Sequence, residues 1–105
     1  PIELMRRVTT EMHATEMTIG YGQTEASPLV TQTRFDDSLD LRVGTVGRVL
    51  PGCEARIVDP QTGRELPDGQ SGEFCARGHG LMLGYYRQPE MTAQAIDAEG
   101  WLHTG

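Results

Sequence analysis

The chain has 105 residues, with 9 Lys and Arg against 15 Asp and Glu, giving a formal net charge of −6. This length allows one domain at most. The scattered acidic charge argues against nucleic acid or an anionic membrane as a partner, because phosphate neutralisation requires clustered Lys and Arg. No apolar run approaches the roughly 18 residues of a membrane-spanning helix, so no transmembrane segment is predicted.

The first 25 residues have the pattern of an α/β unit. Residues 17–21 alternate in polarity, which predicts a strand, and residues 21–25 follow at its carboxyl end, where ligands bind in open α/β sheets. An amphipathic helix is predicted before the strand, with Pro1 tolerated in its first turn. Its apolar positions recur at spacings of three and four: Ile2, Met5, Val8 and Met12.

After Pro28 the character of the sequence changes. Residues 31–42 are polar and acidic and are predicted to form a surface linker loop. Turn residues then recur about every 8 to 12 positions, which is typical of an antiparallel β unit. The predicted elements are strands at 43–49, 53–58, 73–77 and 101–104 and a short helix at 89–96. We therefore expect an α+β fold divided into residues 1–30, 31–42 and 43–105, with the last part β-barrel-like.

Residues 20–25 carry the groups that a nucleotide bound with a metal ion requires. The Tyr21 ring, between glycines, is free to lie flat against a purine. The Thr24 hydroxyl can donate to a phosphate oxygen. The Glu25 carboxylate offers the hard oxygen ligands that Mg²⁺ prefers. The plainer alternative is a strand end, a tight turn and a surface glutamate, because short motifs often match by chance.

Other reactive side chains are expected to have structural roles. Cys53 and Cys75 are too few and too far apart for a metal cluster, and both are predicted to be small buried thiols in a reduced, cytoplasmic setting. Glu73 is predicted to be a strand-edge or turn-bonding carboxylate. Three histidines are isolated, without metal-ligand spacing: His13, His79 and His103. Three aromatic residues are expected to pack: Tyr85 and Tyr86 against the short helix, and Trp101 as an anchor.

Several motifs follow one another in a recognisable order. They are YGQTEASP at 21–28, GTVGRVLPG at 44–52, GQSGEFCARG at 69–78, MLGYY at 82–86 with PEMT at 89–92, and GWLHTG at 100–105. Over nearly the whole chain this succession resembles the adenylate-forming superfamily of acyl-CoA synthetases, aryl-CoA ligases, luciferases and peptide-synthetase adenylation domains. The first motif and the helix before it look most like medium- to long-chain fatty acyl-CoA synthetases.

The resemblance implies ATP or AMP, Mg²⁺ and CoA as ligands and a carboxylic acid as substrate. Tyr21 would stack on adenine, Thr24 would contact the α-phosphate as a catalytic residue, and Glu25 would be the catalytic metal ligand. The remaining members of the nucleotide- and substrate-binding set would be Gly20, Gly22 and Gln23. Thr104 and Gly105 match the start of a Thr-Gly-Asp motif whose aspartate binds the ribose.

The resemblance further implies a fragment of the large N-terminal lobe. Without a phosphate loop, the ribose-binding aspartate and a C-terminal lobe with its lysine, the isolated chain is predicted to be inactive. Its exposed apolar helix face is predicted to favour self-association. Three alternatives stay open: a peptide-synthetase adenylation domain, a non-catalytic β interaction module, and a degenerate, inactive homologue.

Overall fold

The structure is a computed structural model that describes residues 2–105. Pro1, predicted to lie in the first helical turn, is outside the described residues. In chain order the elements are α1 (Ile2–Glu11), β1 (Gly20–Gly22), the 3-10 helix η1 (Thr24–Ala26), β2 (Leu29–Gln32), α2 (Leu39–Gly44), β3 (Arg48–Val49), β4 (Cys53–Val58), β5 (Glu73–Gly78), α3 (Pro89–Ala95) and β6 (Leu102–His103). The predicted α+β class is confirmed.

The strands form two antiparallel sheets of three strands each, ordered β1-β2-β3 and β4-β5-β6. The β4–β5 ladder is the longest and runs in unbroken register from Cys53 opposite Gly78 to Val58 opposite Glu73. Within residues 2–105 neither sheet closes into a barrel, in contrast to the barrel-like arrangement expected for the last part of the chain.

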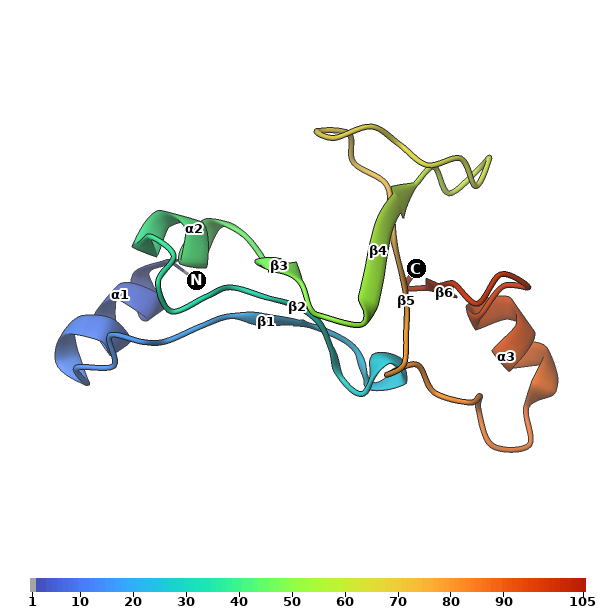
Figure 1. The fold of residues 1–105 in the computed structure, drawn as a ribbon, viewed down its shortest axis with the longest axis horizontal. Helices are drawn as coiled ribbons and strands as arrows, with labels where there is room; N and C mark the ends of the chain where they lie inside the picture. Colours follow the sequence, from blue (N-terminus) through green and yellow to red (C-terminus); the bar gives the residue numbers. More distant parts are fainter. Residues whose placement is uncertain (1) are drawn as a thin grey trace.

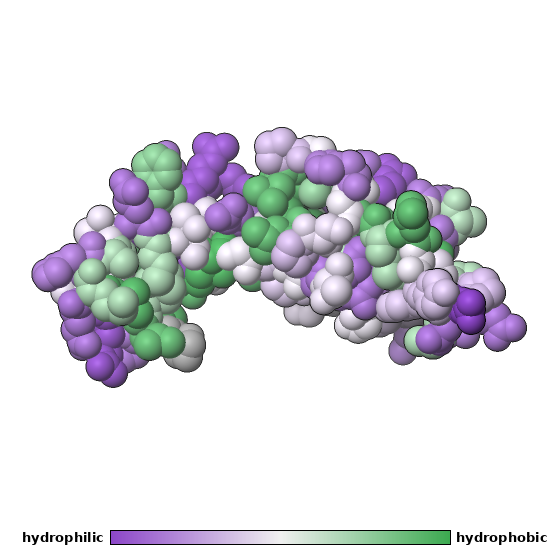
Figure 2. All heavy atoms as spheres, turned by 90° about the horizontal axis from the view of Figure 1, so that it is seen from below, coloured by the Kyte–Doolittle hydropathy of each residue, from purple (hydrophilic) through white to green (hydrophobic). Residues whose placement is uncertain are grey.

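The molecule is elongated (Figure 1), with α1 and α2 at one end, the first sheet between, and the second sheet with α3 at the other end. Its extents are 48 × 32 × 22 Å and its radius of gyration is 16.0 Å, against about 13 Å for a compact domain of this length. Apolar surface is left open as a result, and Ile2 and Leu4 of α1 are 49% and 55% exposed. Figure 2 shows hydrophobic patches open on the surface.

Two small clusters form the core. One joins the two sheets beneath η1 and the other lies within the second sheet. Because the first cluster includes a residue of η1, burial fixes that short helix against the second sheet. Their buried members are Ala26, Val30, Ala76 and Leu102 in the first cluster, and Val58, Cys75 and Trp101 in the second.

The first strand begins later than predicted, and side chains supply most of the bonds before it. The expected range was 17–21, whereas β1 covers Gly20–Gly22. The Ile19 amide donates to the Thr33 hydroxyl at 2.7 Å, although the Ile19 carbonyl still accepts from the Thr33 amide at 2.9 Å. The buried Arg42 of α2 donates through Nη1 to the carbonyl oxygens of Thr15 and Met17, at 2.9 Å each. These bonds satisfy backbone acceptors that a ladder would otherwise use.

The linker loop predicted at 31–42 is present only at 33–38. The rest of the predicted range holds the end of β2 and the start of α2. Thr31 is polar yet buried, since its hydroxyl donates to the carbonyl of Val46 at 2.7 Å. Ser38 caps α2 by accepting from the amide of Leu41 at 3.3 Å. The strand expected at 43–49 is reduced to β3, because its first residues end α2; the division into three segments stays a prediction.

The remaining elements follow the sequence pattern closely. β4 and β5 match the strands predicted at 53–58 and 73–77, and β6 covers the middle of the strand predicted at 101–104. α3 matches the helix predicted at 89–96 and begins with Pro89 in its first turn, where the missing amide costs no hydrogen bond.

Candidate functional site

The turn between β1 and β2 is built around one close backbone approach. A Cβ atom on Gly22 would lie 1.9 Å from the carbonyl oxygen of Pro28, so only glycine fits there. Gln23 is extended, with φ −148° and ψ 166°, and Thr24 begins η1. Ser27 then ends η1 in the left-handed region at φ 56°. The backbone of this turn is therefore held in one tight conformation.

The segment before α3 supports the turn from beneath. The amide of Met82 donates to the carbonyl oxygen of Glu25 at 2.7 Å. Ala26 is buried, and the space beside its carbonyl is so narrow that a Cβ on Gly80 would approach it to 2.8 Å. η1 is thus fixed on one side by residues that lie far along the chain.

The Glu25 carboxylate is held by a single side chain among the described residues. Its Oε1 accepts a hydrogen bond from the Tyr85 hydroxyl at 2.7 Å. This bond, and next the residue's own amide, lower the pKa of Glu25, so the group is ionised at neutral pH. Within residues 2–105 no second side chain bonds the carboxylate. An ionised carboxylate with a spare oxygen fits a Mg²⁺ ligand, because Mg²⁺ is commonly held by one or two carboxylates and by phosphates.

The Tyr21 ring of the first sheet contacts an aromatic ring of the second sheet. It packs edge-on against Phe74 of β5, with ring centroids 5.3 Å apart and planes at 87°. The residue stays 38% exposed, so part of the ring remains open to a ligand. Thr24 is exposed, and in the described part of the chain its hydroxyl has no hydrogen-bond partner. Gly20, Gly22 and Gln23 contribute backbone to the same turn.

Sequence reasoning missed the partners of the turn, Phe74 and Tyr85. The prediction that Tyr85 and Tyr86 both pack against the short helix is wrong for Tyr86, which is 82% exposed. The Arg87 guanidinium carbon lies over the Tyr86 ring, 5.1 Å from its centroid. Tyr85 is half-buried and reaches Glu25, and no local pattern could distinguish it from its neighbour.

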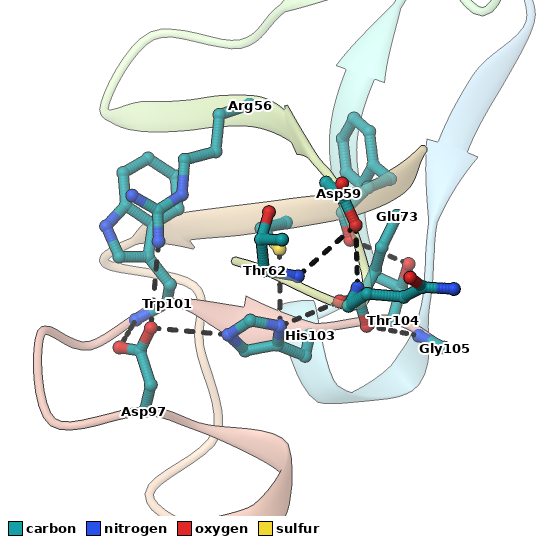
Figure 3. A network of polar contacts seen from close by, with 12 residues as sticks. Arg56, Asp59, Thr62, Glu73, Asp97, Trp101, His103, Thr104 and Gly105 are labelled. Atoms are coloured by element: carbon teal, nitrogen blue, oxygen red, sulfur yellow. Dashed lines mark hydrogen bonds and ion pairs between the residues drawn. The ribbon is translucent and has the colours of Figure 1, made fainter. Parts of the chain in front are cut away.

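A second polar group of residues, the His103 network, lies beside β5 and β6 (Figure 3). His103 pairs through Nδ1 with Glu73 Oε2 at 2.9 Å and through Nε2 with Asp97 Oδ2 at 3.3 Å. The prediction that His103 is isolated is therefore wrong. Glu73 Oε1 also accepts from the Gly105 amide at 3.1 Å, which agrees with its predicted turn-bonding role.

Both carboxylates favour the protonated form of His103. Glu73 first, then Asp97, raise the pKa of His103 against the opposing effect of burial. The same pairing lowers the pKa of Glu73. When His103 is protonated, the network therefore brings one positive charge between two carboxylates.

The Glu73, Cys75 and His103 ligand atoms lie within 4.8 Å of one another, close enough to be considered as a metal site. A metal needs a thiolate and a neutral imidazole nitrogen. Here burial, and next the Glu73 charge, raise the pKa of Cys75, while His103 Nδ1 is paired with Glu73. The trio is therefore better explained as a hydrogen-bonded His103–Glu73 pair beside a buried thiol.

Trp101 has the packing role predicted for it. The residue is 7% exposed, and two guanidinium groups lie over its ring, Arg56 at 4.1 Å and Arg77 at 4.5 Å. Cys53 is half-buried, Cys75 is buried, and both are free thiols. No helix in the described range has the length and apolar character needed to cross a bilayer.

The chain is similar to enzymes that join acids to CoA. It is 50% identical over 105 residues to YngI of Bacillus subtilis, which is named as an acyl-CoA synthetase, covering 100% of this chain and 19% of that protein. It is 45% identical over 109 residues to the acyl-CoA ligase sidI of Aspergillus fumigatus, covering 100% of this chain and 18% of sidI. It is 47% identical over 88 residues to 4-coumarate–CoA ligase 1 of Glycine max, covering 82% of this chain and 30% of that protein.

Solved enzyme structures also superpose on the chain. The amide bond synthetase McbA of Marinactinospora thermotolerans matches with a TM-score of 0.87 at 34% identity, over 100% of this chain and 21% of that one. ATP-bound MatB of Rhodopseudomonas palustris matches with a TM-score of 0.84 at 36% identity, over 99% of this chain and 20% of MatB. These similarities define an adenylate-forming fold.

The family can be stated more narrowly. The sequence model of the AMP-binding enzyme family matches residues 1–86, and the chain belongs to this family. The predicted resemblance to the adenylate-forming superfamily is confirmed. The chain spans about a fifth of the length of YngI and sidI, at 19% and 18%.

Proposed function

We propose that the parent enzyme, meaning a protein of the relatives' length that carries residues 1–105, is an ATP-dependent acid–CoA ligase. The observation that carries this proposal is the ionised Glu25 carboxylate, held by Tyr85 on a turn that also presents an open tyrosine ring and an exposed threonine hydroxyl. Membership of the AMP-binding family and the CoA-ligase names of its relatives support it.

The proposed reaction has two steps. A substrate carboxylate oxygen forms a bond to the α-phosphorus of ATP, and pyrophosphate leaves. The CoA thiol then releases its proton to solvent, its sulfur bonds to the acyl carbon, and AMP leaves with the electron pair of the broken acyl–oxygen bond. The first step brings two anions together, so the protein must supply orientation and offset negative charge.

Each residue of the turn has a proposed role in that step. Thr24 donates its hydroxyl to an α-phosphate oxygen, and Tyr21 presents its open ring surface to adenine. Glu25 would hold Mg²⁺, which supplies Lewis-acid charge neutralisation on the phosphates. Gly22 provides the close backbone approach, Gly22 and Gln23 border the substrate carboxylate, and Gly20 belongs to the nucleotide-binding set.

For the substrate we propose a medium- to long-chain fatty acid, on the strength of the YGQTEASP motif. Relatives named for 4-coumarate make an aromatic acid the principal competitor. Transfer to a carrier-protein thiol, as in a peptide synthetase, is the second alternative; the CoA ligases among the relatives favour CoA. Comparing kcat/KM for octanoate, palmitate, 4-coumarate and an amino acid separates these choices.

We also propose that the 105 residues alone do not catalyse adenylation and that they self-associate. The elongated shape and the exposed apolar side chains of α1 support this, since a partner surface would cover them. ATP–pyrophosphate exchange by the isolated chain would contradict its inactivity. A strict monomer in light scattering at high concentration would contradict its self-association.

The compartment is proposed from the cysteines. The two free cysteines favour a reducing compartment, and we propose the cytoplasm.

The decisive test of the proposed function is Glu25→Gln in the parent enzyme. The amide keeps the shape but loses the charge, and we expect ATP–pyrophosphate exchange to fall by about 100-fold or more. Glu16→Gln is the matched control, because Glu16 is exposed and lies away from the turn in sequence. Exchange at the wild-type rate in Glu25→Gln would remove Glu25 from the mechanism and favour residues 1–105 as a non-catalytic β module of the parent. Absence of exchange in the wild-type parent would overturn the proposed function itself.

A further inference from the structure

Glu25 is contacted twice by a segment that lies far along the chain. The Met82 amide bonds its main-chain carbonyl, and the Tyr85 hydroxyl bonds its carboxylate, both at 2.7 Å. The first contact fixes where the residue lies and the second fixes where its side chain points. Tyr85 is 60 residues from Glu25 in sequence, so this arrangement depends on the tertiary fold.

Tyr85 is itself held in place by α3. Its amide donates to Thr92 Oγ1 at 2.9 Å, and the Thr92 hydroxyl donates to the carbonyl of Gln88 at 2.9 Å. The Gln88 amide in turn donates to the Tyr85 carbonyl at 3.1 Å. Gly84 has φ +147°, and a Cβ there would lie 2.8 Å from the Thr92 side chain. The phenol therefore reaches Glu25 from a fixed support.

A hydroxyl donor suits this task better than a cation would. It orients the carboxylate through one oxygen while leaving the negative charge unneutralised. A Lys or Arg in its place would compete with a metal ion for that charge. Groups that hold a metal-ligating carboxylate commonly change metal affinity by about 10- to 100-fold when removed.

We infer that Tyr85 is a positioning residue that holds the Glu25 carboxylate in the orientation required for divalent-cation binding with the nucleotide. This inference rests on the proposed function. It gives α3, which contributes no ligand, a purpose in the site: Thr92 fixes Tyr85, and Tyr85 fixes Glu25.

Tyr85→Phe in the parent enzyme tests the inference, because it removes one oxygen and keeps the ring. Mn²⁺ binding in the presence of a non-hydrolysable ATP analogue, followed by electron paramagnetic resonance, should weaken by about 10-fold. The half-saturating Mg²⁺ concentration for exchange should rise similarly. Tyr86→Phe is the matched control, because Tyr86 is the next residue and is 82% exposed. Both the Mn²⁺ affinity and the half-saturating Mg²⁺ concentration should stay at the wild-type level in this variant.

A double variant separates failure of the inference from failure of the proposed function. If Glu25→Gln weakens Mn²⁺ binding and Tyr85→Phe adds nothing to it, Tyr85 acts through Glu25. Wild-type Mn²⁺ binding in Tyr85→Phe, or a loss that simply adds to that of Glu25→Gln, would overturn the positioning role alone. Wild-type binding in Glu25→Gln would remove the metal role from the proposed function as well.

Discussion

The Tyr21–Glu25 turn and the His103 network use similar polar groups in opposite ways. In the network, His103 has a carboxylate on each ring nitrogen, and Glu73 bonds both the ring and a backbone amide. In the turn, Glu25 has one hydroxyl partner, and the Thr24 hydroxyl has none within residues 2–105. Paired groups stabilise the fold, whereas groups with unused bonding capacity are the ones a ligand can engage.

The contrast extends to burial. The network lies next to Trp101, which is 7% exposed beneath two guanidinium groups, while Tyr21 keeps 38% of its surface open. Substitutions in the network should therefore change stability first, and substitutions in the turn should change ligand binding first. Single variants in each region can break this separation.

The largest expected effect is Trp101→Ala in the parent enzyme. Removing the buried indole leaves a cavity and removes the ring that the Arg56 and Arg77 guanidinium groups contact. The free energy of unfolding should fall by about 3–5 kcal/mol. Denaturant unfolding measures this, with the exposed Tyr86→Ala as control. A loss below about 1 kcal/mol would show that Trp101 is not the packing anchor of the second sheet.

In the turn, Gly22→Ala should break the close approach. The new Cβ would meet the Pro28 carbonyl at 1.9 Å, and backbone on both sides must move, costing about 1–3 kcal/mol and weakening nucleotide binding. Gly44→Ala is the control, because a Cβ atom on Gly44 would have no atom within 4 Å. Equal ATP affinity in the two variants would contradict a site built on this turn.

How far the sequence predicts these two regions depends on the range of the interactions. β4, β5 and α3 are predictable because alternation and Pro89 are local patterns. The end of β2 is missed because Thr31 is polar but finds its partner 15 residues away. α2 is missed because its buried Arg42 finds its partners 25 and 27 residues away. A buried polar residue with a distant partner looks like a loop residue in the sequence.

The same limit applies to the sites. Tyr21, Thr24 and Glu25 are close together in the chain, so their resemblance to a nucleotide-binding motif is visible in the sequence. Tyr85 joins them from 60 residues away, and the His103–Glu73 pair spans 30. Those contacts exist only once the sheets have formed.

The His103 network predicts a pH dependence of stability. Because the pKa of His103 is raised, its contribution is complete below about 6.5 and is lost as the pH rises through the higher folded value. The pKa of Glu73 is lowered, so its contribution is present above about 4.3 and is lost as the pH falls through the lower folded value.

His103→Gln should therefore destabilise the parent enzyme most between about pH 5 and 6, by about 1 kcal/mol, and much less near pH 9. Thermal unfolding across this range measures the difference. His13→Gln is the control, since His13 is exposed and lies outside the network. A destabilisation that is constant with pH would mean that His103 acts through packing and not through its charge.

The smallest expected effect is Ser27→Gly, at the left-handed residue that ends η1. Serine at φ 56° is strained by about 1–2 kcal/mol, and glycine relieves this but loses more chain entropy on folding. The net stabilisation should be about 0.5 kcal/mol, measured by thermal unfolding. Because Ser27 contributes no group to the proposed site, ATP–pyrophosphate exchange should stay at the wild-type rate. A large fall in exchange without a loss of stability would show that the turn needs this strained residue for ligand binding, and the separation between open and paired regions would then be incomplete.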